Sequence, residues 1–260
     1  MKLNIVPART GITWVKLGIQ TFFKQPLALA GLFFMYMAAA TLASLIPVVG
    51  VVLALAIVPA ATLGLMAATQ EATKGKFPMP AILVSAFRAG RQRARAMLVL
   101  GFLYAGACLV IVAIVPLFFD LPATRAGALT PEMQGVMLAV MLLYLPVSVL
   151  FWHAPALVHW HGVSPVKSLF FSAVVCFRNA GAYTLFGLAW MVVLIVVGLV
   201  VSMLAGLLAS PEAAAALVMP AALLMAAMFS TSIYFTFRDS FDATPADPID
   251  GNVTTSGDTP

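Results

Sequence analysis

The sequence predicts an all-α polytopic membrane protein, with six transmembrane helices arranged as three hairpins and an interfacial amphipathic helix before each hairpin. Two observations indicate this fold class. The 260 residues are 63% hydrophobic and only 9% charged, with a mean hydropathy of +1.06, whereas about 25% of the residues of a soluble domain are charged. The chain also contains continuous apolar runs of the roughly 20 residues that a helix needs to cross a bilayer core. Because these runs do not alternate polar with apolar residues, they are not strands of a membrane barrel.

The first predicted element is an interfacial helix at residues 10–25, within a cytoplasmic N-terminal region of residues 1–26. Ile12, Val15 and Ile19 fall on one helical face, and polar side chains fall on the other. Such a helix lies on the membrane surface, and we expect Trp14 in the headgroup region.

The membrane domain is predicted to cover residues 27–237. Its six spans are residues 27–46, 49–69, 96–119, 133–157, 183–209 and 213–237. The first two spans are joined by little more than Pro47-Val48. A re-entrant first hairpin, which stops short of the far side, is therefore the alternative to two full spans.

Two further interfacial helices are expected, at Pro80–Arg95 and from Ser164-Pro165 to Arg178. A hydroxyl residue followed by proline suits a helix start, because the hydroxyl caps free N–H groups and proline fits the first helical position. Residues 238–260 are acidic and rich in Pro, Gly, Ser and Thr, which predicts a disordered cytoplasmic tail.

The distribution of charge predicts the orientation. With six spans, 13 of the 14 basic residues lie on the side of both termini, and only Arg125 lies opposite. Basic loops stay in the cytoplasm, so we expect an inner (plasma) membrane protein with both termini cytoplasmic. Five spans would place the C-terminus outside.

The three hairpins share features of an internal repeat. The second span of each hairpin contains a proline, at Pro59, Pro146 and Pro220. In a true repeat, three kinked helices would line the same region of a pseudo-threefold bundle, around a cavity or a packed centre. Chance recurrence of proline in an apolar chain is the alternative.

The predicted spans contain no Asp, Glu, Lys or Arg. Ion-coupled carriers keep such groups at mid-membrane, so their absence argues against a secondary transporter. A channel, or a carrier for an apolar solute, stays possible. The sequence also groups no nucleophile, base and acid, and we predict neither an enzyme nor a cofactor.

The three histidines, His153, His159 and His161, lie within nine residues of one another. Histidine binds zinc and copper, so a metal site is one interpretation. The favoured interpretation is an aromatic belt with Trp152 and Trp160 at headgroup level, because no cysteine or carboxylate joins the cluster.

The basic residues that precede the third span are candidates for binding the headgroups of anionic membrane lipids. They are Lys74, Lys76, Arg88, Arg91, Arg93 and Arg95. Topological anchoring alone is the alternative, and nucleic acid is not an expected partner.

Small residues recur every four positions along the fifth span. They are Gly198, Ser202, Gly206 and Ser210. This ladder lets a second helix approach closely, and it serves either packing within the chain or a homo-oligomer.

At FWHAPALVHWHGVSPVKSLFFSAVVCFRN, residues 151–179, the chain resembles an uncharacterised family of betaproteobacterial polytopic inner-membrane proteins. The matching positions are Phe151, Trp152, Ala154, Pro155, Leu157, Trp160, His161, Pro165, Lys167, Ser172 and Asn179. The helix-plus-hairpin layout is more distantly similar to the membrane domain of glycerophosphodiester phosphodiesterases. Because this sequence carries no catalytic domain of that kind, the resemblance implies topology and compartment only.

We therefore expect a non-enzymatic inner-membrane scaffold or envelope-homeostasis protein that binds lipids or partner proteins. The alternative is a channel or carrier for a small or lipid-like solute, with the proline-containing helices as its walls.

Overall fold

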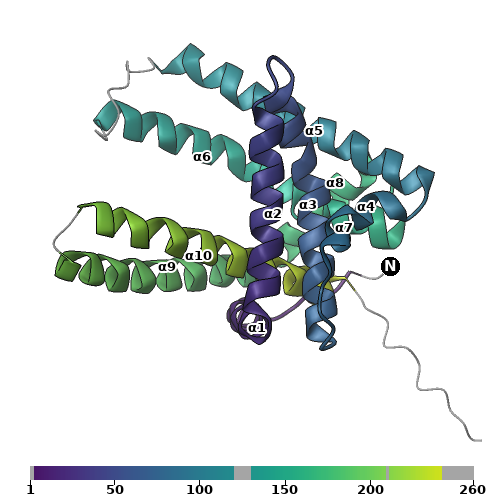
Figure 1. Cartoon of the computed structure of the whole chain (residues 1–260). Helices are drawn as coiled ribbons and strands as arrows, with labels where there is room; N and C mark the ends of the chain where they lie inside the picture. The colour runs from purple at the N-terminus through teal and green to yellow at the C-terminus, as the bar shows by residue number, and fades with distance from the viewer. Residues whose placement is uncertain (1–2, 120–129, 209–210, 242–260) are drawn as a thin grey trace, which may run out of the picture.

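The computed structural model describes residues 3–119, 130–208 and 211–241, and in this part of the chain the fold is all-α, as predicted. In chain order the elements are α1 (Thr10–Lys24), α2 (Pro26–Ser44), α3 (Gly50–Thr73), the 3-10 helix η1 (Pro80–Val84), α4 (Ser85–Arg88), α5 (Arg91–Phe118), α6 (Pro131–Phe151), α7 (Ala154–His161), α8 (Pro165–Arg178), α9 (Ala180–Leu208) and α10 (Pro211–Ser240) (Figure 1). The predicted tail, Arg125 and Ser210 lie outside the described residues.

Six helical segments in the described residues are long and apolar enough to cross a membrane. They form the three predicted hairpins, α2–α3, α5–α6 and α9–α10. The fourth segment combines α6 and α7, which are separated at Trp152 and His153. α6 ends at Phe151 and α7 continues to His161, beyond the predicted end of this span at about residue 157.

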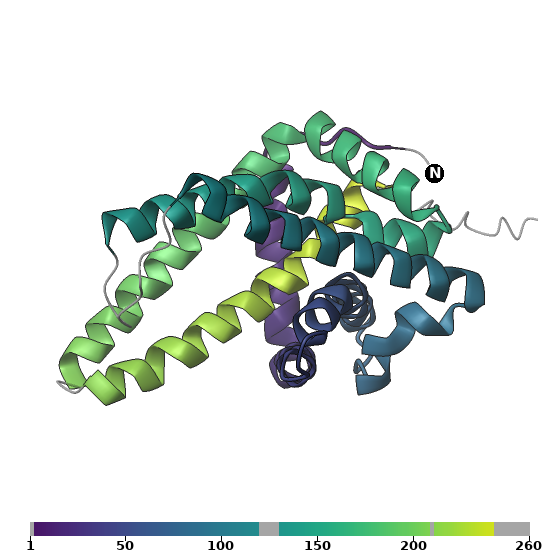
Figure 2. The same cartoon turned by 90° about the horizontal axis from the view of Figure 1, so that it is seen from above.

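The three hairpins point in different directions. In Figure 1 the α5–α6 and α9–α10 hairpins extend to the same side, whereas α2–α3 runs across them. Figure 2, which views α2 and α3 nearly end-on, shows the same arrangement. The first hairpin, expected either to span or to be re-entrant, therefore takes a direction of its own.

The helix starts follow the predicted cap chemistry in part. Pro131 begins α6, and the Thr130 hydroxyl accepts a hydrogen bond from the Met133 N–H at 3.3 Å. Pro165 begins α8, but the Ser164 side chain makes no cap hydrogen bond. The proline position therefore marks both helix starts, and the hydroxyl caps one of them.

The single interfacial helix predicted at Pro80–Arg95 was wrong. η1 and α4 occupy residues 80–88, and the chain breaks at Gly90, whose φ of +99° suits glycine far better than a residue with a Cβ. The long helix α5 begins directly afterwards, at Arg91. Arg91, Arg93 and Arg95 consequently lie in the first turns of a membrane helix.

The helix α1 is amphipathic, but its buried face packs inside the molecule. Trp14 is fully buried, and its Nε1 donates to Asp239 Oδ2 at 2.9 Å, so its ring packs inside the protein, while its place at headgroup level stays a prediction. α1 lies against α9 and α10. A Cβ on Gly11 would clash with the Ala182 carbonyl oxygen, and one on Gly18 with Ser232. These two glycines permit the close crossing.

The short helices close a ring of contacts among the three hairpins. α1 packs on α9 and α10 of the third hairpin, η1 and α4 pack on α3 of the first, and α8 packs on α6 of the second. η1, α4 and α8 thus contact the hairpin that precedes them in the chain. α1, which precedes all three hairpins, contacts the last of them. This recurrence supports an internal repeat.

The prolines do not share the position that the repeat predicts. Pro59 is buried, whereas Pro146 and Pro220 are exposed. The prediction that three kinked helices line one region was therefore wrong. The reason is that the hairpins splay apart, so that equivalent positions face different surroundings.

The two ends of the described chain lie together. Leu3 forms an antiparallel bridge with Phe241, and the Asn4 N–H donates to the Ser240 carbonyl oxygen at 2.9 Å. Val6 N–H donates to Asn179 Oδ1 at 2.9 Å. α10 therefore returns the chain to the N-terminal segment, as expected if both ends lie on the same side of the membrane.

Candidate functional site

The break between α6 and α7 is held by buried hydrogen bonds. His153 is fully buried. The backbone N–H of His153 donates to Ser172 Oγ at 3.0 Å, and Ser172 Oγ donates to the Val149 carbonyl oxygen at 2.7 Å. The His153 imidazole Nε2 is hydrogen-bonded to the Tyr183 hydroxyl. The break is thus tied to α8 and α9.

The three histidines have different surroundings. The His153 ring lies among Tyr183, Phe237 and Phe241. His161 is exposed, and its ring contacts Phe237 and Phe241. The His159 ring contacts Trp160. In the described part of the chain, no three His, Cys, Asp or Glu side chains are grouped as metal ligands.

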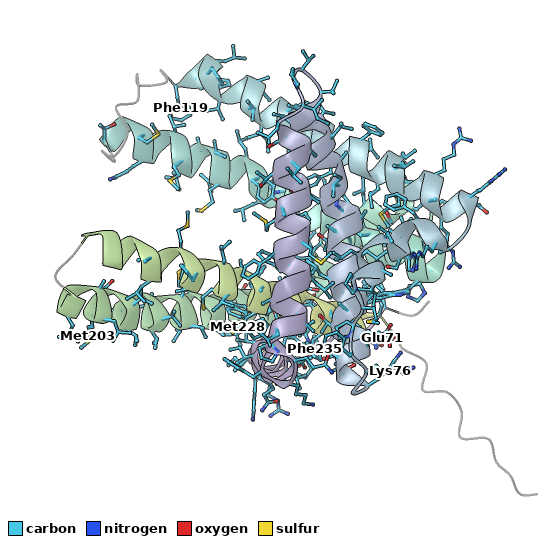
Figure 3. All side chains as sticks on the ribbon, viewed as in Figure 1. Glu71, Lys76, Phe119, Met203, Met228 and Phe235 are labelled. Atoms are coloured by element: carbon cyan, nitrogen blue, oxygen red, sulfur yellow. The ribbon has the colours of Figure 1, made fainter. Side chains whose placement is uncertain are left out.

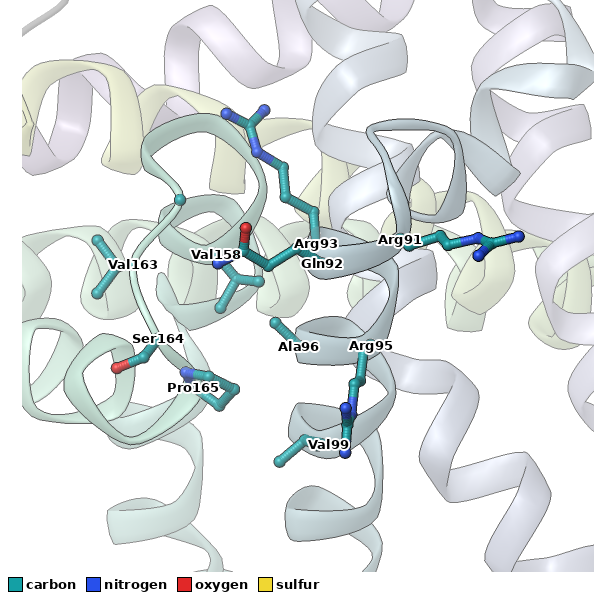
Figure 4. Close-up of a pocket in the computed structure, with 11 residues that line it drawn as sticks. Arg91, Gln92, Arg93, Arg95, Ala96, Val99, Val158, Val163, Ser164 and Pro165 are labelled. Carbon is teal, nitrogen blue, oxygen red and sulfur yellow. The ribbon is translucent and has the colours of Figure 1, made fainter.

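A basic cavity of about 700 Å³ lies between the start of α5 and the turn from α7 to α8 (Figure 4). We call it the arginine pocket. It is lined by Arg91, Gln92, Arg93, Arg95, Ala96, Val99, Val158, Gly162, Val163, Ser164 and Pro165. Figure 4 shows Arg93 and Arg95 extending to opposite sides of the start of α5, while Arg91 is directed away from the α7–α8 turn.

The local fold explains why this pocket is basic. Gly90 ends α4 and lets α5 begin with three arginines, and Gly162, with a φ of +65°, ends α7 in the left-handed conformation. Arg93 lies next to Gly162, at the carbonyl end of α7, where a cation is favoured by the helix dipole. The N-termini of α5 and α8 both lie at the pocket, and they add partial positive charge.

Within the described residues, no carboxylate pairs with the arginines of the pocket. The ion pairs there are Lys74–Glu71, at 3.9 Å, and Arg238–Asp239, at 2.7 Å. None of the described residues that line the pocket is acidic. In this part of the chain, its guanidinium groups are therefore available to an anion.

Only part of the predicted headgroup cluster comes together. Arg91, Arg93 and Arg95 line the pocket, whereas Arg88 ends α4 and is exposed away from it. Lys74 and Lys76 lie at the end of α3, where Figure 3 labels Glu71 and Lys76. The Lys76 carbonyl oxygen accepts from Gln25 Nε2 at 3.2 Å.

Sequence reasoning missed the other wall of the pocket. Gly162, Val163 and Ser164 stand about 70 residues beyond the arginines. The Ser164-Pro165 signal identified a helix start, but nothing in its spacing connects that start to α5. The contact is tertiary.

The ladder predicted on the fifth span is not used within the described chain. Gly198, Ser202 and Gly206 are exposed, and a Cβ on either glycine would meet no atom within 4 Å. Packing of this ladder within the chain was therefore the wrong expectation. The reason is that α9 packs through its earlier residues, Ala182, Phe186 and Trp190.

Comparison with known proteins places the chain in a family. It is 37% identical over 254 residues to a probable inner membrane protein of Burkholderia thailandensis, an alignment that covers 93% of this chain and 94% of the relative. The chain belongs to this family. With its six candidate spans, it is a multi-pass inner membrane protein.

The comparisons add a compartment but no chemistry. No family model matches the chain, and no solved structure matches it. The more distant resemblance to the membrane domain of glycerophosphodiester phosphodiesterases stays a prediction. The arginine pocket is consequently the candidate site with the most specific chemistry.

Proposed function

We propose that this inner membrane protein is a non-enzymatic scaffold that binds the headgroups of anionic phospholipids in the arginine pocket, on the cytoplasmic side. The observation that carries the proposal is that Arg91, Arg93 and Arg95 line one cavity that has no acidic residue among its described walls. Guanidinium groups bind phosphate oxygens through paired N–H donors, which makes arginine well suited to a phosphodiester.

The position of the pocket suits a lipid rather than a free anion. α5 continues from the pocket as an apolar helix for the rest of its 28 residues. Ala96, Val99 and Val163 line the cavity beside the arginines. A ligand with a charged head and an apolar body would bury both parts there.

The helix ends add a second attraction for phosphate. The first N–H groups of a helix have no partner within the helix, and the dipole at that end favours an anion. α5 and α8 both begin at the pocket. Together with the arginines that line the pocket, they favour an anionic lipid over a zwitterionic one, since a zwitterionic headgroup brings its own cation.

The experiment is lipid retention. The protein, purified in mild detergent from bacterial membranes, is examined by native mass spectrometry and by analysis of extracted lipids. Arg93→Gln/Arg95→Gln is compared with Lys74→Gln/Lys76→Gln, which removes the same charge from the end of α3. We expect the arginine variant to lose at least about tenfold in retained phosphatidylglycerol and cardiolipin, and the lysine variant to keep them.

Equal retention by both variants would overturn the proposal and favour topological anchoring as the role of the arginines. A topology reporter fused to the C-terminus provides the second measurement. An unchanged orientation in the arginine variant shows that lost lipid is not a consequence of misinsertion.

A channel or carrier for a lipid-like solute is the second candidate. One observation favours it, a cavity that lies beside Pro59 within the spans. Neither Pro146 nor Pro220 lines that cavity, so the predicted three-walled pathway has no support. A scaffold that binds lipid accounts for more of the structure.

A further inference from the structure

A second cavity, of about 390 Å³, lies among helices that are apolar enough to cross a membrane. Its walls come from α3, α5, α6, α7 and α10, and from Trp152 between α6 and α7. Tyr104 lines it and stands midway along α5, while Pro59 lines it from the middle of α3. Along α5 this cavity begins at Tyr104, roughly 7.5 Å beyond Val99 of the arginine pocket.

Aromatic rings form much of this cavity. Five of the lining residues are aromatic, namely Tyr104, Tyr144, Phe151, Trp152 and Phe229. The Tyr104 and Phe151 rings meet edge-to-face at 5.1 Å, and the Trp152 and Phe229 rings do so at 6.1 Å. A flat ring can stack on, or meet the edges of, such walls.

Contacts outside the cavity hold these walls in place. Trp152 Nε1 donates to Thr236 Oγ1 at 3.0 Å, and the Trp152 ring also packs against Tyr183 and Phe186. Trp152 therefore cannot rotate into the space without losing a buried hydrogen bond. The cavity is preformed, which is typical of small-molecule sites.

The cavity offers one hydrogen-bond donor and no charge. The Tyr104 and Tyr144 hydroxyl oxygens lie 2.7 Å apart, and only one proton can lie between them. When Tyr104 donates to Tyr144, the Tyr144 proton is free for a ligand. Ser148 and Thr62 also line the cavity, but their hydroxyls donate to carbonyl oxygens of their own helices, at 2.8 and 2.9 Å.

We propose that this cavity binds a neutral, lipid-soluble molecule with a flat ring and a carbonyl oxygen, the chemistry of a membrane quinone headgroup. The aromatic walls select the ring, the Tyr144 hydroxyl donates to the carbonyl, and the apolar helices around the cavity favour a solute that dissolves in lipid. Acyl chains instead contact the exposed aliphatic side chains on the outer faces of the helices, such as Leu194, Ile195 and Leu199 on α9. This site is separate from the arginine pocket, and neither proposal depends on the other.

Fluorescence quenching tests the proposal, because Trp152 forms part of the wall. A short-chain ubiquinone analogue is titrated into the full-length protein in detergent micelles. We expect saturable quenching in the wild type. Tyr104→Phe/Tyr144→Phe keeps the rings but removes both hydroxyls, and it should weaken binding about three- to tenfold through the lost hydrogen bond.

Three further arms separate specific binding from other effects. Tyr234→Phe, which removes a phenol that does not line this cavity, should leave the affinity unchanged. Ser148→Phe should fill the space and abolish saturable quenching, while its unfolding midpoint shows that the fold is kept. A fatty alcohol with the tail of the analogue should not displace it.

Two results would overturn the proposal. One is quenching that rises without saturation in the wild type, as for partition into micelles. The other is saturable quenching that persists unchanged in both the double tyrosine variant and Ser148→Phe. Displacement by the fatty alcohol would show that the chain rather than the ring is recognised, and would also reject it.

Discussion

Two pairs of glycines in this molecule behave in opposite ways. Gly11 and Gly18 lie on α1 where it crosses α9 and α10, and a Cβ at either position would overlap with another helix. Gly198 and Gly206 lie on α9, and a Cβ there would meet nothing within 4 Å. Spacing alone favoured the second pair as a packing site, yet the chain packs through the first.

The contrast extends to the two ends of the third hairpin. Phe235, on the part of α10 that packs with α1, is 1% exposed, whereas Met203, in the later part of α9, is 71% exposed (Figure 3). Lipid tails are as apolar as these side chains, so there is little hydrophobic force to bring membrane helices together. Helix contact therefore concentrates where small residues and hydrogen bonds hold the helices, at the end that joins α1, α7 and α8.

The largest expected effect is at the α1 crossing. Gly18→Leu would force α1 away from Ser232, whose Oγ accepts a hydrogen bond from Trp190 Nε1 at 3.2 Å. We expect a loss of about 3 kcal/mol or failure to accumulate in the membrane. The measurement is the thermal unfolding midpoint in detergent, followed by loss of the monodisperse size-exclusion peak. A midpoint equal to that of the wild type would show that α1 does not pack as described.

The next effect is at the break between α6 and α7. His153→Ala removes a fully buried ring and its hydrogen bond to Tyr183, which should cost about 3 kcal/mol. His161→Ala, at an exposed ring, should cost within about 1 kcal/mol. The two unfolding midpoints distinguish this account from a shared metal site, in which both variants would lose the metal and show a similar cost.

The thiol of Cys176, on α8, tests the packing of the helices around the α6–α7 break. Burial raises the pKa of Cys176 to about 12, so the folded protein holds it as the unreactive thiol well above the pH at which an unfolded chain ionises. In a Cys108→Ala background we expect Cys176 to resist maleimide at pH 8 and to react fully once denatured. By the same linkage, this group stabilises the fold at neutral pH, and that contribution is lost as pH rises from about 9 towards about 12. Rapid labelling of the native protein at pH 8 would contradict the burial of Cys176.

The smallest effect is expected on the open face of α9. Gly198→Leu meets open space and should change the free energy of unfolding by no more than about 0.5 kcal/mol. The same unfolding assay applies, beside Gly18→Leu as its matched counterpart. A loss comparable to that of Gly18→Leu would mean that another helix contacts this face.

The spans and most helix starts could be predicted from the sequence, because hydropathy and proline position act locally. Pro131 and Pro165 begin helices as expected. The break at Gly90 was missed, since the amphipathic pattern of residues 80–95 continues through it. One left-handed glycine there decides which helix carries the arginines.

Burial and the pocket were beyond prediction because they depend on contacts between distant segments. Trp14 has the sequence context of an interfacial residue, but its partner Asp239 lies 225 residues further on. The arginines were recognised as a basic group, while the α7–α8 turn that completes their pocket was not. Periodicity identifies the face of a helix and does not identify what covers it.

The most direct test of the central claim is a cryo-electron microscopy structure of the protein in nanodiscs that contain phosphatidylglycerol. We expect an ordered phosphate in the arginine pocket, against the arginine side chains that line it. Ordered headgroups at Lys74 and Lys76, with none in the arginine pocket, would contradict it.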